Sequence, residues 1–274
     1  MDKVARGRGW VERPDCRIYY ETAGSGPALV FAHGLGGNHL SWWQQVPHFS
    51  ARYTCVTYSH RGFAPSTAPA DGPRTEEFGP DLEALVEHLR LNDVVVVGQS
   101  MGGWSALDYA LTHPHRLKAM VLSATSGAID PASLGGEGGE RFAAWRAMSD
   151  AALGAGAAKG EHPAAGARMA AEQPALHYLY RAMDELSALD KVAMRHRLFA
   201  SRNRPVSDLA AVAVPVLWVT GEEDIVFPSP VAPFLAQAMP RAEHVEIPRV
   251  GHSGYFEDSA AFNAVVDDFL ARLG

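Results

Sequence analysis

The sequence predicts an α/β fold in which a doubly wound, mostly parallel sheet carries an inserted helical cap. Short β-like runs alternate with helical segments over most of the chain, which is typical of parallel strands covered by helices. The alternation stops between residues 125 and 205, and a sharp strand-to-helix turn surrounds Ser100. These three observations define the expected fold class and the place of its functional site.

The expected strands are short apolar or β-branched runs bounded by turn residues. They are residues 17–22, 28–32, 53–57, 94–97, 119–123, 216–220 and 245–247. Residues 75–91 place apolar side chains at helical spacing, which predicts one amphipathic helix despite Gly79-Pro80 near its start. A second helix is expected over residues 104–112.

Residues 125–205 predict the helical cap, because this stretch contains no strand-like run and bears Met and aromatic residues on helical pieces. The core is then expected over residues 1–124 and 206–274. Among the cap side chains, Trp145 and Met148 are candidates for lining a substrate pocket, since ligand sites are mostly apolar. Ordinary packing between cap and core is the alternative role for each of them.

The pentapeptide Gly98-Gln99-Ser100-Met101-Gly102 follows an apolar strand and precedes a helix. Such an abrupt turn forces the turning residue into a strained conformation, and the positions two before and two after it must be small. The serine hydroxyl is then held out at the C-terminal edge of the sheet, above a helix N-terminus that favours developing negative charge. The pattern therefore predicts Ser100 as a nucleophile.

A glycine-rich loop after the strand at 28–32 supplies a second part of the expected site. Its sequence is His-Gly-Leu-Gly-Gly over residues 33–37, and the glycines let the backbone pass close to a bound substrate. We expect the backbone amides of Leu35 and Met101 to form an oxyanion hole.

A carboxylate and an imidazole follow the last two expected strands. Asp224 lies in the turn after residues 216–220, and His252 lies in the loop after residues 245–247. An imidazole within reach of a serine can take its proton, and a carboxylate can hold that imidazole in the required tautomer. Glu222 and Glu223 share the turn with Asp224 and are alternative acids.

Over nearly its whole length the chain resembles the α/β-hydrolase superfamily. The order Ser100, Asp224, His252 matches that family's order of nucleophile, acid and base. The family's His-Gly pair, Gly-x-x-Asp turn and Gly-His turn match as well, and its Arg-Gly turn appears at residues 61–62. One departure is Ser59, which stands two residues before that arginine, where relatives often carry Asp. The hydrogen bonding of this loop is therefore left open.

The resemblance implies a serine hydrolase that cleaves a carboxylic ester or lactone of small to medium size through an acyl-enzyme, without a cofactor or metal. A serine nucleophile argues against haloalkane dehalogenase and epoxide hydrolase relatives, whose chemistry needs a carboxylate. One alternative is a carbon–carbon bond hydrolase of ring-fission diketones, which uses the same triad but often has Trp where this chain has Ser253. Another is a non-catalytic ligand receptor. Perhydrolase or haloperoxidase behaviour is expected only as a side activity.

Composition and charge agree with one catalytic domain. The chain has 274 residues, of which 47% are hydrophobic and 20% charged, enough for one core and an insertion. Its formal charge of −7 argues against nucleic-acid and anionic-membrane partners.

Residues 1–7 lack a signal-peptide pattern, so a cytoplasmic enzyme is expected. Cys16 and Cys55 are expected to be reduced thiols. The sequence leaves a homodimer open.

Overall fold

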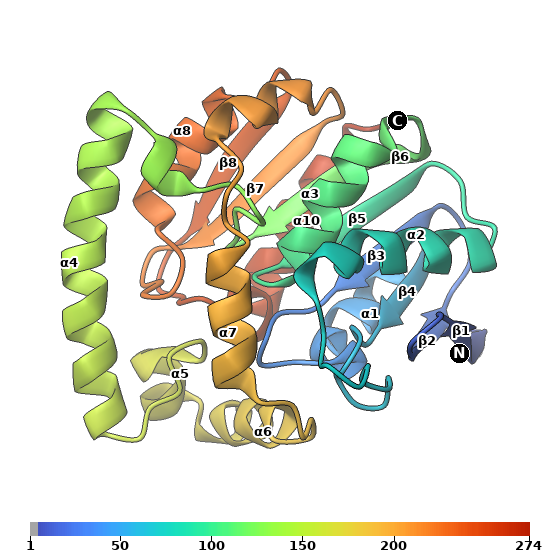
Figure 1. Cartoon of the computed structure of the whole chain (residues 1–274), viewed down its shortest axis with the longest axis horizontal. Coiled ribbons are helices and arrows are strands. Elements are labelled where there is room, and N and C mark those ends of the chain that lie inside the picture. Colours follow the sequence, from blue (N-terminus) through green and yellow to red (C-terminus); the bar gives the residue numbers. More distant parts are fainter. Residues whose placement is uncertain (1–4) are drawn as a thin grey trace.

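The protein is described by a computed structural model over residues 5–274, with eight strands in one sheet (Figure 1). Residues 1–4, which belong to the segment expected to lack a signal peptide, lie outside the described residues. The strands are β1 (Arg6–Glu12), β2 (Arg17–Ala23), β3 (Ala28–Ala32), β4 (Thr54–Tyr58), β5 (Val94–Gln99), β6 (Leu117–Ser123), β7 (Val216–Gly221) and β8 (Ala242–Ile247).

The sheet is parallel except at one edge. The strand order is β1-β2-β4-β3-β5-β6-β7-β8. β1 pairs antiparallel with β2, and β2 pairs antiparallel with β4. Every later pair is parallel, so the carboxyl ends of β3, β5, β6, β7 and β8 meet at one edge of the sheet. Ligand sites of such sheets lie at this edge.

Helices cover both faces of the sheet (Figure 1). The α-helices are α1 (Gln45–Phe49), α2 (Phe78–His88), α3 (Gly102–Thr112), α4 (Gly136–Ala158), α5 (Gly166–Glu172), α6 (Pro174–Asp184), α7 (Lys191–Ala200), α8 (Ala232–Gln237), α9 (Gly254–Glu257) and α10 (Ser259–Ala271). Short 3-10 turns span His39–Trp42, Thr75–Glu77, Pro114–Arg116, Pro131–Ser133, Val206–Ala211 and Ser229–Val231. Among residues 5–274, no helix combines the length and apolarity needed to cross a membrane.

Alternate side chains of the central strands enter two different cores. Val30 of β3 and Val96 of β5 belong to the apolar cluster that includes α2 and α3. Phe31 and Val97, the next residues along, belong to the cluster that includes α1 and α10. Successive side chains of a strand point to opposite faces, and a strand covered on both faces is apolar throughout. This double burial is the physical reason for the unbroken valine run of β5.

The predicted α/β fold class is confirmed, and all seven expected strands form with small shifts of their ends. The helix expected over residues 75–91 forms as a 3-10 turn followed by α2, and the one expected over residues 104–112 forms as α3. β1 is not among the expected strands, because Arg6-Gly7-Arg8-Gly9 alternates charge with glycine and buries almost nothing. This edge strand forms by pairing its backbone with β2.

Four helices, α4 to α7, lie between β6 and β7 in the chain, within the stretch that lacks strand-like runs. Figure 1 shows α4 on the side of the molecule opposite β1 and β2. The chain enters and leaves this segment side by side, because an isolated parallel bridge joins Ile129 to Arg204. The Asp130 amide donates to the Arg204 carbonyl oxygen at 2.8 Å.

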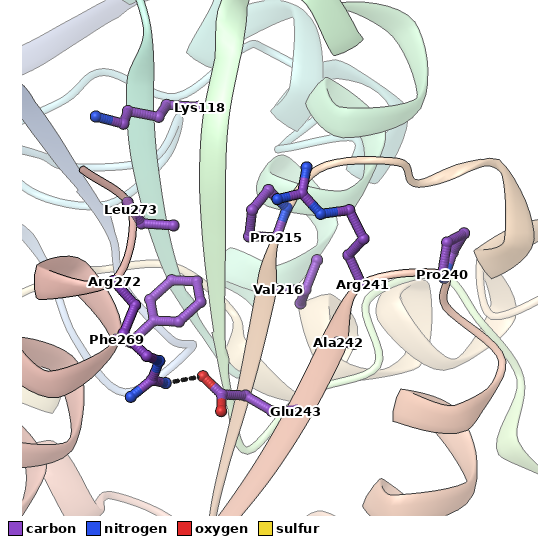
Figure 2. A pocket seen from close by; sticks show the side chains of 10 residues that line it. All are labelled: Lys118, Pro215, Val216, Pro240, Arg241, Ala242, Glu243, Phe269, Arg272 and Leu273. Carbon is purple, nitrogen blue, oxygen red and sulfur yellow. Dashed lines mark hydrogen bonds and ion pairs between the residues drawn. The ribbon is translucent and has the colours of Figure 1, made fainter.

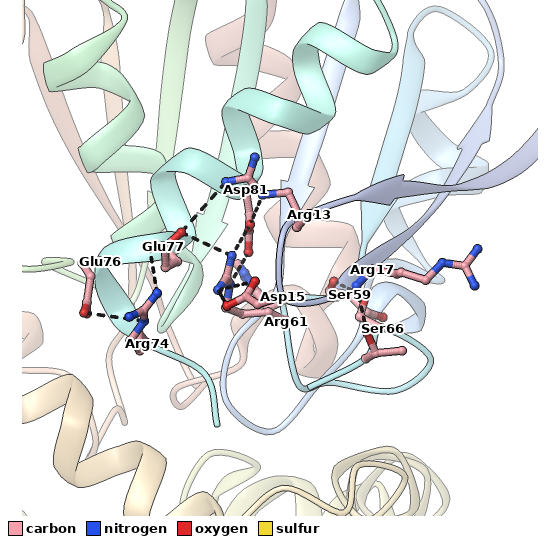
Figure 3. A network of polar contacts seen from close by, with 12 residues as sticks. Arg13, Asp15, Arg17, Ser59, Arg61, Ser66, Arg74, Glu76, Glu77 and Asp81 are labelled. Carbon is pink, nitrogen blue, oxygen red and sulfur yellow. Dashed lines mark hydrogen bonds and ion pairs between the residues drawn. The ribbon is translucent and has the colours of Figure 1, made fainter. Parts of the chain in front are cut away.

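A buried ion network holds the turn that follows β4 (Figure 3). The Arg61 side chain is fully buried and makes two bonds of 2.7 Å to the Asp81 carboxylate in α2. Arg13 also binds Asp81, at 2.8 Å, and Asp15 and Glu77 lie 3.2 and 3.4 Å from the Arg61 guanidinium. A buried charge of this kind is stable only while its partners remain. The network therefore fixes residues 61–62 against α2.

We expect Asp81→Asn to lower the free energy of unfolding by about 3–5 kcal/mol, since it leaves the buried Arg61 charge without its bidentate partner. Urea unfolding followed by circular dichroism measures this loss. The matched control is Glu137→Gln, which breaks an exposed pair with Arg141 and is expected to cost less than about 1 kcal/mol. Equal losses in the two variants would show that burial of the Arg61 network adds nothing to the free energy of unfolding.

Candidate active site

Ser100 occupies the sharp turn between β5 and α3, and its backbone has a left-handed φ of 49°. A Cβ on Gly102 would lie 2.1 Å from the Ala32 carbonyl oxygen, and a Cβ on Gly98 would lie 2.7 Å from the Gly102 carbonyl oxygen. The Ser100 amide donates to the Ser123 carbonyl oxygen at the end of β6, at 3.0 Å. The two glycines are therefore required by close backbone contacts around the serine.

Ser100, His252 and Asp224 form one hydrogen-bonded chain. His252 Nε2 lies 2.9 Å from Ser100 Oγ, and His252 Nδ1 lies 2.9 Å from Asp224 Oδ2. Since the carboxylate only accepts, Nδ1 carries the proton and Nε2 is free to accept from the serine hydroxyl. Both His252 and Asp224 are buried, with 4% and 2% of their surface exposed. The structure thus brings together three residues that are far apart in the sequence.

The turn after β7 orients Asp224 toward His252, while the side chains of Glu222 and Glu223 bind other groups. Asp224 Oδ1 accepts from the amides of Val226 and Phe227, at 2.7 and 2.9 Å, so that Oδ2 is left for the histidine. Glu222 accepts from the Arg249 amide. Glu223 forms an ion pair with Arg168 of α5. Neither alternative acid is bonded to His252 in the described structure.

Helix α4 packs on this same turn. The Trp145 indole N–H donates to the Asp224 carbonyl oxygen at 3.1 Å, and the Ser149 hydroxyl donates to the Ile225 carbonyl oxygen at 2.6 Å. Met148 lies between them in sequence and is 49% exposed. Through its bond to the Asp224 backbone, Trp145 connects α4 to the core.

The loop after β3 runs close to the serine. A Cβ on Gly34 would lie 2.1 Å from the Gln99 side-chain oxygen and 3.1 Å from the Ser100 Cβ. Within the described part of the chain, the amides of Leu35 and Met101 donate no hydrogen bond to another protein group. Two unpartnered amides beside a serine hydroxyl can bind an oxyanion.

His33 braces this loop as a neutral imidazole. Its Nδ1 donates to the Gly34 carbonyl oxygen at 2.7 Å, and its Nε2 accepts from the His60 amide at 2.9 Å. Complete burial lowers the pKa of His33 to about 3, so the ring carries no charge at neutral pH. His33 therefore supports the backbone of the loop through a fixed tautomer.

Ser59 resolves the hydrogen bonding of the loop in which the sequence departs from the family pattern. Its hydroxyl donates to the Ala64 carbonyl oxygen at 3.0 Å and accepts from the His39 amide at 3.1 Å. The Ser66 hydroxyl donates to the Ser59 carbonyl oxygen at 2.6 Å. The next ring, His60, packs against His33 and Phe78. A serine thus replaces the carboxylate that relatives often carry and is itself fully bonded, whereas both ring nitrogens of His60 are buried without a hydrogen-bond partner among the described residues.

An apolar cluster borders the serine on the α7 side, and we call it the serine-side cluster. It consists of Phe63, Phe78, Met101, Trp104, Met194 and Leu198, with Leu35, Ala128 and Leu189 packed against it. Met194 and Leu198 are one helical turn apart on α7. Their spacing was the available sequence signal for an inward face of this helix.

Helix α6 contacts two loops of the site through one buried side chain. The Ser253 hydroxyl, next to His252, donates to Tyr180 Oη at 3.2 Å. A Cβ on Gly36 would lie 2.9 Å from the same phenol oxygen. Burial raises the pKa of Tyr180 well above its usual range, so the phenol stays protonated.

Two hollows open on the surface. One of about 540 Å³ lies where β7 and β8 begin, at the edge of the sheet opposite Ser100, and Figure 2 shows Lys118 and Arg241 in its lining together with Arg272, which is paired with Glu243. The other, about 530 Å³, lies between the loop at residues 62–73 and α7. It shares Leu189 and Met194 with the serine-side cluster, so it borders the candidate site.

Neither a metal-binding group nor a reactive thiol is found among residues 5–274. Among residues 5–274, no group of three or more His, Cys, Asp or Glu side chains is arranged to hold a metal ion. Cys16 and Cys55 are free and buried. Burial raises the pKa of Cys16 to about 11 and that of Cys55 to about 12, so neither supplies a thiolate at neutral pH.

Comparison with known proteins agrees with this architecture. The Mycobacterium tuberculosis protein BpoC, which carries the name of a non-heme bromoperoxidase, is 30% identical over 93% of this chain and 98% of its own length. The 3-oxoadipate enol-lactonase 2 of Acinetobacter baylyi is 26% identical over 94% of this chain and 95% of its own. The solved structure of Est816, described as an N-acyl homoserine lactone degrading enzyme, has a TM-score of 0.76 at 26% identity and covers 95% of this chain and 100% of its own.

The family whose description is alpha/beta hydrolase fold matches residues 27–259. This range contains Ser100, Asp224 and His252 together with every strand from β3 to β8. The resemblance expected from the sequence is thereby confirmed. The chain belongs to the alpha/beta hydrolase family.

Proposed function

We propose that this protein is a serine hydrolase that cleaves a carboxylic ester or lactone of small to medium size through an acyl-enzyme. The observation that carries the proposal is the hydrogen-bonded chain from Asp224 through His252 to Ser100, with 2.9 Å at each link. Relatives named as an enol-lactonase and a lactone-degrading enzyme support the choice of ester and lactone substrates.

In the proposed mechanism, His252 Nε2 takes the Ser100 proton as Ser100 Oγ attacks the substrate carbonyl carbon. Asp224 stabilises the resulting imidazolium, and the amides of Leu35 and Met101 stabilise the oxyanion. The imidazolium then protonates the leaving alcohol. Water, deprotonated by His252, attacks the acyl carbon, and the departing Ser100 recovers the proton as the acid is released.

We assign residues 125–205 to a helical cap that covers this site. The bridge between Ile129 and Arg204 closes the base of the segment, and the side chains of α6 and α7 contact the loops beside Ser100. Within the cap, Met194 and Leu198 are our first candidates for the acyl pocket, because they lie in one cluster with both proposed oxyanion residues. Trp145 and Met148 are the alternative pair.

We also propose a perhydrolase side activity, because the relative BpoC carries the name of a bromoperoxidase. If hydrogen peroxide replaces water in the second step, its oxygen attacks the acyl carbon and releases a peracid, and Ser100 again recovers its proton. This reaction uses the same acyl-enzyme and the same residues, so it needs no further site. Monitoring of peracid formation with an ester and peroxide tests it.

We expect Ser100→Ala to abolish hydrolysis of p-nitrophenyl acetate while leaving the circular dichroism spectrum and unfolding midpoint unchanged, because only one hydroxyl is removed. Residual catalysis should fall to about 10³- to 10⁴-fold over water. Activity close to that of the unmodified protein would exclude the acyl-enzyme mechanism. Cleavage of a ring-fission diketone, but of no ester, by the unmodified protein would favour the carbon–carbon alternative.

The matched pair Asp224→Asn and Glu223→Gln completes this test. An asparagine amide in place of the Asp224 carboxylate cannot hold His252 in the accepting tautomer, so kcat should fall by roughly 10⁴-fold. Glu223 is paired with Arg168, and its replacement should change kcat little. The reverse ranking would assign the acid role to Glu223.

Acyl-length profiles of kcat/KM test the two candidate pocket pairs. We expect Met194→Ala and Leu198→Ala to reduce hydrolysis of long acyl esters, by about fourfold for each methylene left uncovered, with acetate esters little changed. Trp145→Ala should shift all lengths equally, because its indole is bonded to the Asp224 turn. A length-dependent effect confined to Trp145 and Met148 variants would move the acyl pocket to α4.

A further inference from the structure

The carboxylate of Glu257 binds the backbone on both sides of His252. Its Oε2 accepts from the Gly251 amide at 2.8 Å, and its Oε1 accepts from the Ser253 amide at 3.0 Å. The residue ends the short helix α9 and is 7% exposed. One buried side chain thus spans the loop that presents the imidazole to Ser100.

Polar and apolar neighbours bury Glu257, and within residues 5–274 none of them neutralises its carboxylate. The Gln173 side chain donates to the Glu257 carbonyl oxygen at 3.1 Å, and the adjacent rings of Tyr255 and Phe256 are buried. Within residues 5–274, no arginine, lysine or histidine forms an ion pair with Glu257. Its negative charge is therefore held by the two amides of the histidine loop.

The titratable and charged groups that face Glu257 come from three elements. They are Asp224 and Glu223 in the turn after β7, Tyr180 in α6 and Tyr255 in α9 itself. Burial raises the pKa of Glu257 to about 7, the two amides oppose that rise, and Asp224 and Glu223 add to it. The side chain therefore changes its charge in the neutral range, unlike an exposed glutamate.

We propose that Glu257 is a positioning residue that fixes the loop around His252, and that the imidazole keeps its bonds to Ser100 and Asp224 fully only while Glu257 is ionised. A carboxylate offers one acceptor oxygen to each amide. A protonated carboxyl presents an O–H to one of them, so one of the two bonds is lost. The inference rests on the proposed role of His252 as the base.

The direction in which kcat/KM changes with pH follows from the charge of Glu257. Above neutral pH Glu257 is ionised and both amide bonds are present, and below it the loop loses one of them. Protonation of Glu257 therefore lowers kcat/KM about tenfold, as a step in the neutral range, without abolishing activity. Glu257→Gln removes this titrating group, so its profile should lack the step.

Glu257→Gln should also lower kcat about tenfold at alkaline pH with little change in KM, because its amide nitrogen faces one of the backbone N–H groups. Glu257→Asp keeps the charge and should keep the step. The matched control is Asp258→Asn, which changes the neighbouring charge but retains an N-cap for α10. Its profile should be that of the unmodified protein.

A readout that needs no turnover separates this inference from the proposed function. The downfield proton resonance of His252 Nδ1–H is followed by NMR from about pH 5 to about pH 9. We expect a step near neutral pH in the unmodified protein and in Asp258→Asn, and its loss in Glu257→Gln. The same curve, or the same kcat/KM profile, in the unmodified protein and in Glu257→Gln would overturn the role of Glu257. A Glu257-dependent step without any Ser100-dependent hydrolysis would leave that role standing and reject the proposed function.

Discussion

The close backbone approach at Ser100 is the constraint on which the candidate site depends. Helix α3 begins so near to β3 that a Cβ on Gly102 would lie 2.1 Å from the Ala32 carbonyl oxygen. Only glycine fits this space. With glycine there, the chain can turn through a left-handed Ser100 and enter α3 at once. The turn holds the Ser100 hydroxyl at the edge of the sheet and, within residues 5–274, leaves the neighbouring amide of Met101 without a partner, which suits its proposed role in binding an oxyanion.

Two buried carboxylates, bonded to backbone amides, hold the partners of that serine. Asp224 accepts two amides of its own turn with one oxygen, which leaves the other oxygen for His252. Glu257 uses both of its oxygens on the loop that carries His252. Backbone amides are short and rigid donors, so these bonds locate the imidazole more closely than packing of an exposed loop would. The parallel strands bring both loops to the same edge of the sheet.

The helices between β6 and β7 contact every loop of the candidate site. Trp145 of α4 binds the Asp224 turn, Tyr180 of α6 lies between Gly36 and Ser253, and Met194 of α7 packs in the serine-side cluster. Contacts of this kind couple the packing of the helical segment to the geometry of the reacting groups. The same segment therefore has the means both to shape a substrate pocket and to hold the loops in place.

The sequence by itself determined the fold class, the serine turn and the order of the candidate residues, because each depends on local patterns: apolar strands, paired glycines and short turns. Tertiary structure decided which turn carboxylate meets His252, since three lie within three positions of one another. It also decided that β1 forms at an edge and that Ser59 can replace a carboxylate. Glu257 ends α9, and only the folded chain turns its carboxylate back onto the His252 loop, because a bond from a side chain to backbone amides leaves no pattern in the residue types.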